Sequence, residues 1–339
     1  MRIIIYGAGA IGGALGGHLA LAGQEVILIG RPAHVKAIQE HGLRLITPGG
    51  THILQLPAVT VPDQIDFRPD DVVFLCMKGQ NTEEALRSLR EVIDNIPIFC
   101  FQNGVRNEEV AARYFPRVYA VMMRLGSVYL NEGEVSVRRD PPGSLVMGSY
   151  PAGTDELVEA VAAKLRAAGL LVKVAADTMP YKWGKLVFNM VNIVGAITDE
   201  GGSNIELITT ALRQEAQGIL AEAGIRWVSQ ETLSLEWPEG ASKPRSVLPG
   251  KVRSSTWQSL ARRQGGTESD FINGEIVRLA KKIGRQAPIN AMLLHILQEM
   301  AANREPPGKY TPAQLRLLLG LEHTSRQHKS NDGKSKADS

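Results

Sequence analysis

The beginning of the chain places a strand, a glycine-rich turn and a helix in immediate succession. Residues 2–6 (RIIIY) form an apolar run typical of a buried parallel strand, and residues 14–22 follow a helical pattern. The turn between them, GAGAIGG, has the G-x-G-x-x-G spacing that holds a pyrophosphate against a helix N-terminus. Plain α/β packing is the alternative, but this context favours a dinucleotide site. We expect its backbone to bind the cofactor through Gly7, Ala8, Gly9, Ala10, Ile11 and Gly12.

The second strand indicates which dinucleotide binds. Residues 25–29 (EVILI) lead into Gly30 and Arg31, where an NAD-specific protein carries an Asp or Glu for the ribose 2′-hydroxyl. Arg31 instead offers a planar fork of donors that suits a 2′-phosphate. The sequence therefore predicts NADP(H) as the cofactor. The alternative is that Arg31 only begins a solvated loop.

Two further apolar runs, residues 71–77 and 96–101, flank a helical pattern at residues 82–93. This alternation predicts a doubly wound parallel sheet whose ligands bind beyond the carboxyl ends of its strands. Lys78 and Asn103 stand at those ends. Lys78 can reach a phosphate, and Asn103 can bond a ribose, a carboxamide or a substrate, although each alone is also a common kind of turn residue.

The remaining pattern changes from strands to helices along the chain. Residues 119–150 are strand-like with glycines between the runs, residues 154–168 are helical, and residues 170–174 form a last strand. Beyond Pro180 helical patterns dominate, except in the proline-rich stretch 237–251, which predicts a loop. The expected helices cover residues 182–198, 205–224, 254–263, 267–284 and 291–302.

We therefore predict an α/β protein with an N-terminal Rossmann-type doubly wound parallel sheet followed by an all-α C-terminal domain. The NADP-binding domain is expected to cover residues 1–177, and the helical substrate domain residues 178–321. Residues 322–339 lack aromatic and branched apolar side chains. Because such a segment buries too little surface to order itself, we predict a disordered polar tail.

The helical stretch 182–198 carries a polar stripe. At about 100° per residue, Lys185, Asn189 and Asn192 fall within a wedge of roughly 60°, and apolar residues occupy the other directions. Such a helix should be buried, and burial lowers the pKa of a lysine, which makes Lys185 a candidate general acid beside two amides. The alternative is a helix edge with a snorkelling lysine and two internally satisfied asparagines.

Composition excludes several other classes. The chain has 339 residues, 44% of them hydrophobic and 22% charged, which is ordinary for a globular protein. A net charge of +3 argues against nucleic acid, and no apolar run reaches the roughly 18 residues of a membrane span. Cys76 and Cys100 lie in apolar runs and fit a core better than a disulfide or a metal site. We expect a cytoplasmic protein without a metal, and the sequence leaves open whether the helical domain forms a homodimer.

Seven features follow one another in a characteristic order: GAGAIGG, Arg31, Lys78 in CMKGQNT, Asn103 in FQNGV, KWGKLVFN, SSTWQ and TESDFINGEIV. In this order and spacing they resemble the ketopantoate reductase family (2-dehydropantoate 2-reductases), and the resemblance covers residues 1 to about 305. The family implies that Lys185 protonates a carbonyl oxygen as hydride arrives from the nicotinamide, with Lys182 as its local competitor. Asn189 and Asn103 would hold the hydroxyl and carbonyl ends of the substrate.

The resemblance also implies roles for two later residues. Ser255 would bind the substrate carboxylate, and Glu268 would contact a substrate hydroxyl or the nicotinamide ribose, although both residues also suit a plain helix start. The family's second helix asparagine lies eight residues after the lysine, where this chain has Ile193, so Asn192 is the expected substitute with a shifted reach. The segments around Ser255 and Glu268 depart from the family pattern as well, which leaves the identity of the substrate open.

The expected activity is the NADPH-dependent reduction of a small 2-oxo acid, first of all 2-dehydropantoate to (R)-pantoate in pantothenate and coenzyme A biosynthesis. One alternative is a family paralogue that reduces a different 2-oxo acid. Another is a non-catalytic NADP(H)-binding sensor. Lys185, Asn189 and Glu268 together argue against a sensor, because a sensor needs no proton donor.

Overall fold

The structure is a computed structural model that describes residues 1–236, 253–263 and 265–321. The predicted loop at 237–251 and the predicted tail at 322–339 lie outside the described residues. Two compact units make up the chain: one contains Met1–Phe188 and Ile225–Lys251, the other Asn189–Gly224 and Val252–Ser339. The predicted boundary at residue 177 therefore divides the chain differently from these units. Within the described residues, no helix is both long and apolar enough to cross a membrane.

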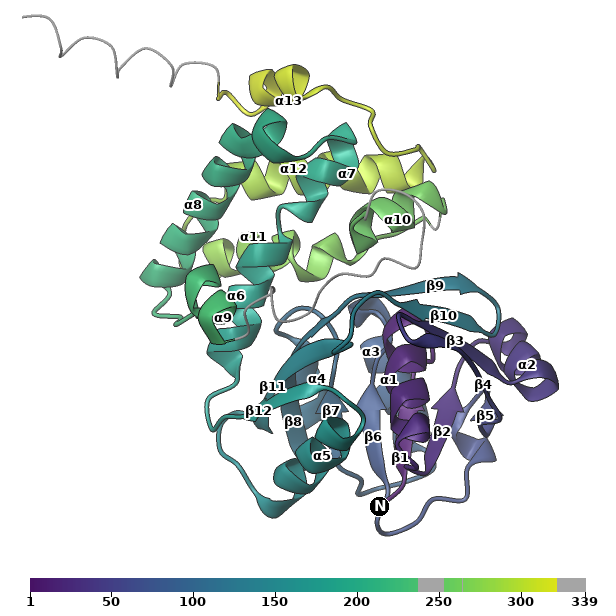
Figure 1. Cartoon of the computed structure of the whole chain (residues 1–339). Coiled ribbons are helices and arrows are strands. Elements are labelled where there is room, and N and C mark those ends of the chain that lie inside the picture. The colour runs from purple at the N-terminus through teal and green to yellow at the C-terminus, as the bar shows by residue number, and fades with distance from the viewer. Residues whose placement is uncertain (237–252, 264, 322–339) are drawn as a thin grey trace, which may run out of the picture. The chain divides into compact units, whose positions relative to one another are not determined.

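The first unit is built on an eight-stranded sheet (Figure 1). Its pairs are parallel except for β8 against β11. The strand order reverses direction between β1 and β6, which creates a switch point at their carboxyl ends. In order across the sheet the strands are β12 (Leu171–Val174), β11 (Gly143–Ser149), β8 (Val118–Leu125), β7 (Ile98–Cys100), β6 (Val72–Leu75), β1 (Ile3–Tyr6), β2 (Val26–Ile29) and β5 (Ala58–Val59).

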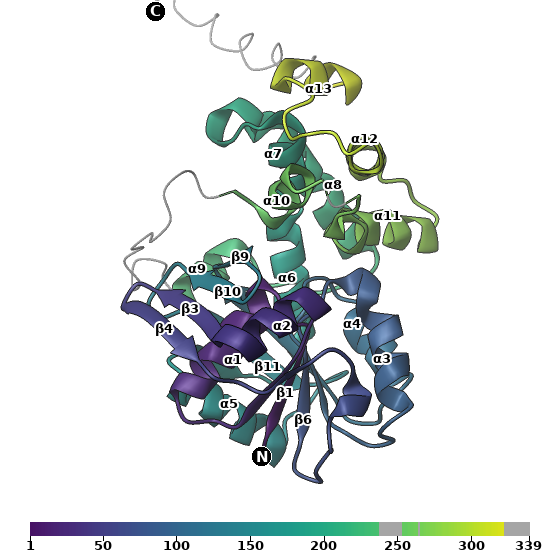
Figure 2. The ribbon, with the colours of Figure 1, turned by 90° about the vertical axis from the view of Figure 1, so that its right-hand side faces the viewer.

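Helices cover both faces of this sheet because its strands are apolar on both sides. Ile3 and Ile5 of β1 join a core with α1 (Ala10–Leu21) and α5 (Glu156–Ala167), while Ile4 joins the opposite core with α3 (Thr82–Arg90) and α4 (Asn107–Ala112). Figure 2 shows α1 and α3 on opposite sides of the strands. The predicted doubly wound parallel sheet is confirmed.

A smaller four-stranded sheet lies on the outer side of α1. Its order is β4 (Gly50–Leu54), β3 (Leu43–Thr47), β10 (Glu134–Val137) and β9 (Ser127–Asn131). The strand-like region 119–150 is confirmed, but β3, β4 and β5 were not predicted, nor was α2 (Pro32–His41). Short strands paired with distant segments leave little local periodicity, and β3 pairs with β10 about ninety residues further on.

The second unit consists of helices: α7 (Asn192–Thr198), α8 (Glu206–Glu222), α10 (Ser255–Ala261), α11 (Asn273–Lys282), α12 (Pro288–Ala302) and α13 (Pro312–Leu318). Short 3-10 turns, η3 (Gly202–Ile205) and η5 (Glu268–Phe271), precede α8 and α11. The single predicted helix 267–284 is therefore wrong in its first turn. The prediction that the region is helical is confirmed.

The predicted continuous helix 182–198 is also wrong. It is two helices, α6 (Met179–Asn189) and α7, separated by a turn at Met190 and Val191. Burial is not complete around α6, because Phe188 is 37% exposed. The buried Asn273 side chain donates to the Met190 carbonyl at 3.2 Å, which stabilises the break.

Candidate active site

The glycine turn after β1 has the geometry that a dinucleotide needs. Gly7 has φ +103°, and a Cβ there would lie 2.5 Å from the Met77 nitrogen, so the turn is closed to larger residues. A Cβ on Gly12 would lie 2.2 Å from the Gly7 carbonyl oxygen. A Cβ on Gly9, in contrast, meets nothing within 4 Å. The turn is therefore tight where it packs and open where a pyrophosphate would approach the start of α1, so these residues fit a dinucleotide.

Arg31 stands at the end of β2, immediately before α2, and its side chain is exposed. Positions 30–35 (GRPAHV) contain no carboxylate that could hold a ribose 2′-hydroxyl. The strand end nearest the glycine turn therefore carries a cation, which suits an additional phosphate better than a diol.

Lys78 and Asn103 follow the ends of β6 and β7, as predicted, and both are half-buried. A hydrogen-bonded chain supports the Asn103 backbone. Gln102 Nε2 donates to Thr82 Oγ1 at 2.7 Å, Thr82 Oγ1 donates to Asn107 Oδ1 at 2.9 Å, and Asn107 Nδ2 donates to the Asn103 carbonyl at 2.8 Å. Thr82 and Asn107 were not recognised from the sequence. The four-residue spacing of Asn103 and Asn107, typical of one helical turn, was the available signal.

The two lysines of α6 have different environments. The Lys182 side chain is 2% exposed; its ammonium pairs with Glu108, which is fully buried, and donates to the Gln102 carbonyl at 3.3 Å. Lys185 is half-buried, and its ammonium donates to the Met123 carbonyl of β8. Burial raises the pKa of Glu108, and the charge of Lys182 opposes that rise. The fold thus pairs the buried Lys182 with a carboxylate, while Lys185 is half-buried and donates to a main-chain carbonyl.

Gly184, between Trp183 and Lys185, allows a close backbone approach. A Cβ at this position would lie 2.2 Å from the Val228 carbonyl oxygen, and the Val228 amide donates to the Pro180 carbonyl at 3.0 Å. The segment after Ile225 therefore packs directly against the start of α6. This contact explains the glycine at position 184.

The remaining predicted site residues lie in the second unit. Asn189 ends α6 and Asn192 begins α7, and both are half-buried. The predicted shared stripe applies to Lys185 and Asn189, which lie on one helix. Asn192 lies beyond the turn, so helical spacing does not describe its direction relative to Lys185. The turn was missed because the signal is tertiary: Asn273 lies 83 residues from Met190.

Ser255 and Glu268 both stand at helix starts. Ser254 is the N-cap of α10, and its hydroxyl accepts a hydrogen bond from the Trp257 amide at 3.2 Å, which leaves Ser255 exposed as the first helical residue. Glu268 is half-buried and opens η5, whose N-cap is Thr267. The structural role thus belongs to the neighbouring hydroxyl residue in each case.

A Rossmann-type sheet with an open glycine turn at its switch point is the arrangement of dinucleotide-binding proteins. Two family models match the chain: Ketopantoate reductase PanE/ApbA over residues 3–152, and its C-terminal counterpart over residues 177–301. The chain belongs to the ketopantoate reductase family, and it is an oxidoreductase.

Individual relatives agree with this family. The 2-dehydropantoate 2-reductase of Pyrococcus horikoshii is 31% identical over 301 residues, which are 86% of this chain and 95% of that protein. Among solved structures, a PanE/ApbA family ketopantoate reductase from Ralstonia eutropha JMP134 is similar with a TM-score of 0.74 and 28% identity, covering 90% of this chain and 99% of that one. D-mandelate dehydrogenase, solved with NADH and anilino(oxo)acetate, is similar with a TM-score of 0.77 and 25% identity, covering 90% of this chain and 99% of that one.

Proposed function

We propose that this protein reduces 2-dehydropantoate to (R)-pantoate with NADPH, and that Lys185 is the general acid. The observation that carries the proposal is the difference in burial on α6: Lys182 is buried in an ion pair with Glu108, whereas Lys185 is half-buried and accessible to a ligand. An ammonium in that environment can give up a proton to a developing alkoxide. The curated relatives named 2-dehydropantoate 2-reductase support the choice of substrate.

The other residues would bind and orient the reactants. When bound, the cofactor supplies the hydride. The backbone from Gly7 to Gly12 would hold its pyrophosphate, and Arg31 and Lys78 would bind phosphate groups. The remaining polar side chains would orient the substrate and the nicotinamide ribose, as the family resemblance implies: Asn103, Asn189, Asn192, Ser255 and Glu268.

Turnover of 2-dehydropantoate, followed through the absorbance of NADPH, tests the proposal. Lys185→Ala should lower kcat by about a thousandfold, because the alkoxide loses both its proton donor and its counter-charge. Lys164→Ala is the matched control, since Lys164 of α5 donates a hydrogen bond to Gln24, between α1 and β2, and lies outside the proposed site. Full activity of a folded Lys185→Ala protein would rule out this proton donor.

Cofactor choice is tested separately. Arg31→Asp should raise the KM for NADPH by about a hundredfold and improve use of NADH, because a carboxylate repels the 2′-phosphate and can bind the ribose diol. The NADH complexes of D-mandelate dehydrogenase make this comparison necessary. If the intact chain and Arg31→Asp prefer NADPH over NADH to the same extent, the proposed role of Arg31 is contradicted.

A second candidate function is the reduction of a bulkier 2-oxo acid. Two residues after Ser255, the indole of Trp257 donates to Asp199 at 2.8 Å, and the Arg253 guanidinium lies 5.1 Å from its ring and pairs with Asp199. This aromatic and charged cluster accompanies the departures from the family pattern. A panel of 2-oxo acids with aliphatic and aromatic side chains distinguishes the two functions. Tight NADPH binding without turnover of any of them would indicate a sensor instead.

A further inference from the structure

The buried ion pair between Lys182 of α6 and Glu108 of α4 connects two parts of the proposed site. We propose that this pair is a positioning element for the reduction, which holds Lys185 and Asn103 in the geometry that hydride and proton transfer require. The inference rests on the proposed function. It assigns no proton transfer to Lys182 itself.

Stability alone is a weak reason for such a pair. The two side chains are 2% and 0% exposed. Taking two charges out of water costs about as much as their attraction returns, and well-packed apolar residues often serve equally well. A buried pair at this place is better explained by what it orients, because ion-pair geometry is directional where apolar packing is not.

The Lys182 end of the pair sets the position of α6. Lys182 and Lys185 are three residues apart, so their side chains are neighbours on one helix face. One ammonium is tied to Glu108 of α4, and the other contacts the Met123 carbonyl of β8. These two contacts, about one turn apart, restrict the rotation and translation of α6. They thereby restrict the positions that the Lys185 ammonium can occupy.

The Glu108 end sets the position of the loop after β7. Glu108 directly follows Asn107, whose side chain donates to the Asn103 carbonyl at 2.8 Å. Lys182 also donates to the Gln102 carbonyl at 3.3 Å, immediately before Asn103. A shift of α6 would therefore be transmitted to Asn103 from both sides. The pair thus links a proposed proton donor to a proposed ligand-binding amide within one compact unit.

The test is the double variant Lys182→Met/Glu108→Leu, because removing one partner alone would strand a buried charge. We expect a folded protein with a thermal midpoint close to that of the intact chain. Its kcat per NADPH-binding site should fall by about ten- to a hundredfold, as small misplacements of reacting groups do. The isotope effect on kcat with NADPH deuterated at the transferred position should rise, because hydride transfer becomes rate-limiting. A purely structural role would reduce only the fraction of folded protein and leave kcat per NADPH-binding site and the isotope effect unchanged. That result would overturn the inference.

The neighbouring residue provides a matched control. Glu109 also lies on α4 but pairs with Arg113 at the surface, so Glu109→Gln should leave kcat and the isotope effect unchanged. If the double variant does not fold, Glu108→Gln decides, because its amide oxygen still accepts from the Lys182 ammonium while the ion pair is lost. A fall in kcat of about tenfold with a raised isotope effect supports positioning, and unchanged values of kcat and isotope effect overturn it. Absence of turnover by the intact protein would overturn the proposed function and this inference with it. An active intact protein with an equally active double variant would overturn this inference alone.

Discussion

His34 is a residue whose protonation the fold controls. It lies on α2, is 2% exposed, and its Nδ1 accepts a hydrogen bond from the Gly133 amide at 2.8 Å in the turn between β9 and β10. Because Nδ1 is an acceptor, the neutral ring carries its proton on Nε2. Burial lowers the pKa of His34, and the Glu132 carboxylate opposes that shift only in part. The contact between α2 and the small sheet therefore depends on a neutral histidine.

The first prediction concerns stability against pH. Below the usual histidine pKa of about 6.5, His34 binds a proton in the unfolded chain but not in the folded protein. The free energy of unfolding should therefore decrease as the pH is lowered. His34→Asn keeps an acceptor for the Gly133 amide but cannot titrate. In urea unfolding, its free energy of unfolding should therefore decrease less than that of the intact chain between neutral and mildly acidic pH. His41→Asn is the control, since the His41 side chain is 79% exposed. An unchanged pH dependence in His34→Asn would disprove this account.

At the scale of elements, the glycines of α1 allow this helix to pack closely against both sheets. A Cβ on Gly16 would lie 2.7 Å from Leu28 of the large sheet, and a Cβ on Gly13 would lie 2.9 Å from Val135 of the small sheet. The helix is therefore packed closely on both sides, which only residues without a side chain permit. Gly9, at its N-terminus, is the exception that leaves open space.

Two substitutions in this turn should separate packing from ligand binding. Gly12→Ala should lower the free energy of unfolding by about 1–3 kcal/mol, because its Cβ meets the Gly7 backbone. Gly9→Ala should change it by less than about 0.5 kcal/mol, yet raise the Kd for NADPH by about tenfold by filling the space for the pyrophosphate. Thermal unfolding and fluorescence titration measure the two effects. Unchanged NADPH affinity in Gly9→Ala would contradict the assigned site.

The break between α6 and α7 depends on a buried polar network. Asn273 donates to the Met190 carbonyl and to Asn290 Oδ1, each at 3.2 Å, and Asn290 in turn donates from its side chain to Glu215 at 2.8 Å. Asn273 and Asn290 are 1% and 0% exposed. Because buried polar groups must be satisfied, these contacts specify where the helix stops.

Asn273→Ala should therefore cost about 1–3 kcal/mol of unfolding free energy, since it leaves buried acceptors without their donor. Asn204→Ala, at an exposed position in η3, is the comparison and should cost little. Denaturant unfolding with equal m-values makes the comparison quantitative. A cost for Asn273→Ala no larger than that of Asn204→Ala would show that packing, rather than this network, sets the break.

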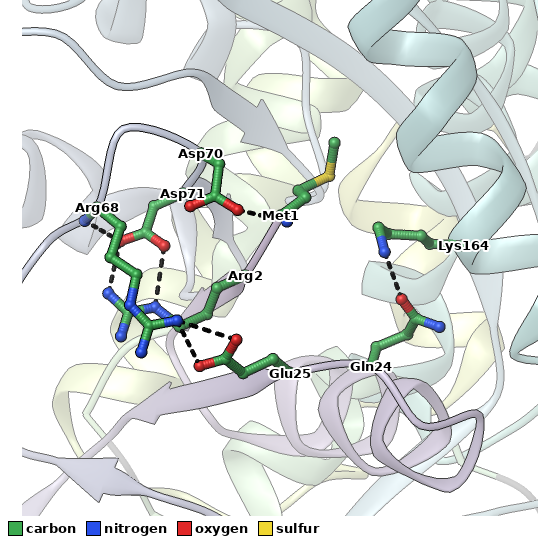
Figure 3. Close-up of polar contacts among 8 residues, drawn as sticks. All are labelled: Met1, Arg2, Gln24, Glu25, Arg68, Asp70, Asp71 and Lys164. Atoms are coloured by element: carbon green, nitrogen blue, oxygen red, sulfur yellow. Dashed lines mark hydrogen bonds and ion pairs between the residues drawn. The ribbon is translucent and has the colours of Figure 1, made fainter.

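At the scale of the molecule, the first unit has a buried ion pair at the amino-terminal ends of its strands and the proposed cofactor site at the opposite ends. Figure 3 shows the amino-terminal end, where Arg2 donates twice to Asp71 at 2.9 and 2.7 Å and Arg68 pairs with Glu25. The side chains of Arg2 and Asp71 are 6% and 0% exposed. The glycine turn lies beyond the other end of β1, roughly 13 Å away for a four-residue strand.

This separation predicts loss of stability without loss of catalysis. Asp71→Ala should cost about 3–5 kcal/mol, because it leaves the Arg2 guanidinium buried without its carboxylate. Arg2→Met/Asp71→Leu should recover most of that loss. In both proteins kcat per folded molecule should equal that of the intact chain, measured well below the midpoint of unfolding. A reduced kcat in the folded double variant would mean that the two ends of the sheet are coupled.

Local pattern in the sequence determined the glycine turn, β1, β2, β6 and β7, the helical character of the second unit, and the family, because apolar periodicity and short motifs depend on neighbours in the chain. Its assignment of the site residues stays a prediction. Tertiary structure alone decided the turn at Met190, the small sheet beside α1 and the pairing of Lys182 with Glu108, 74 residues apart. Each of these depends on which distant group satisfies a buried donor, acceptor or charge, and no local period records that choice.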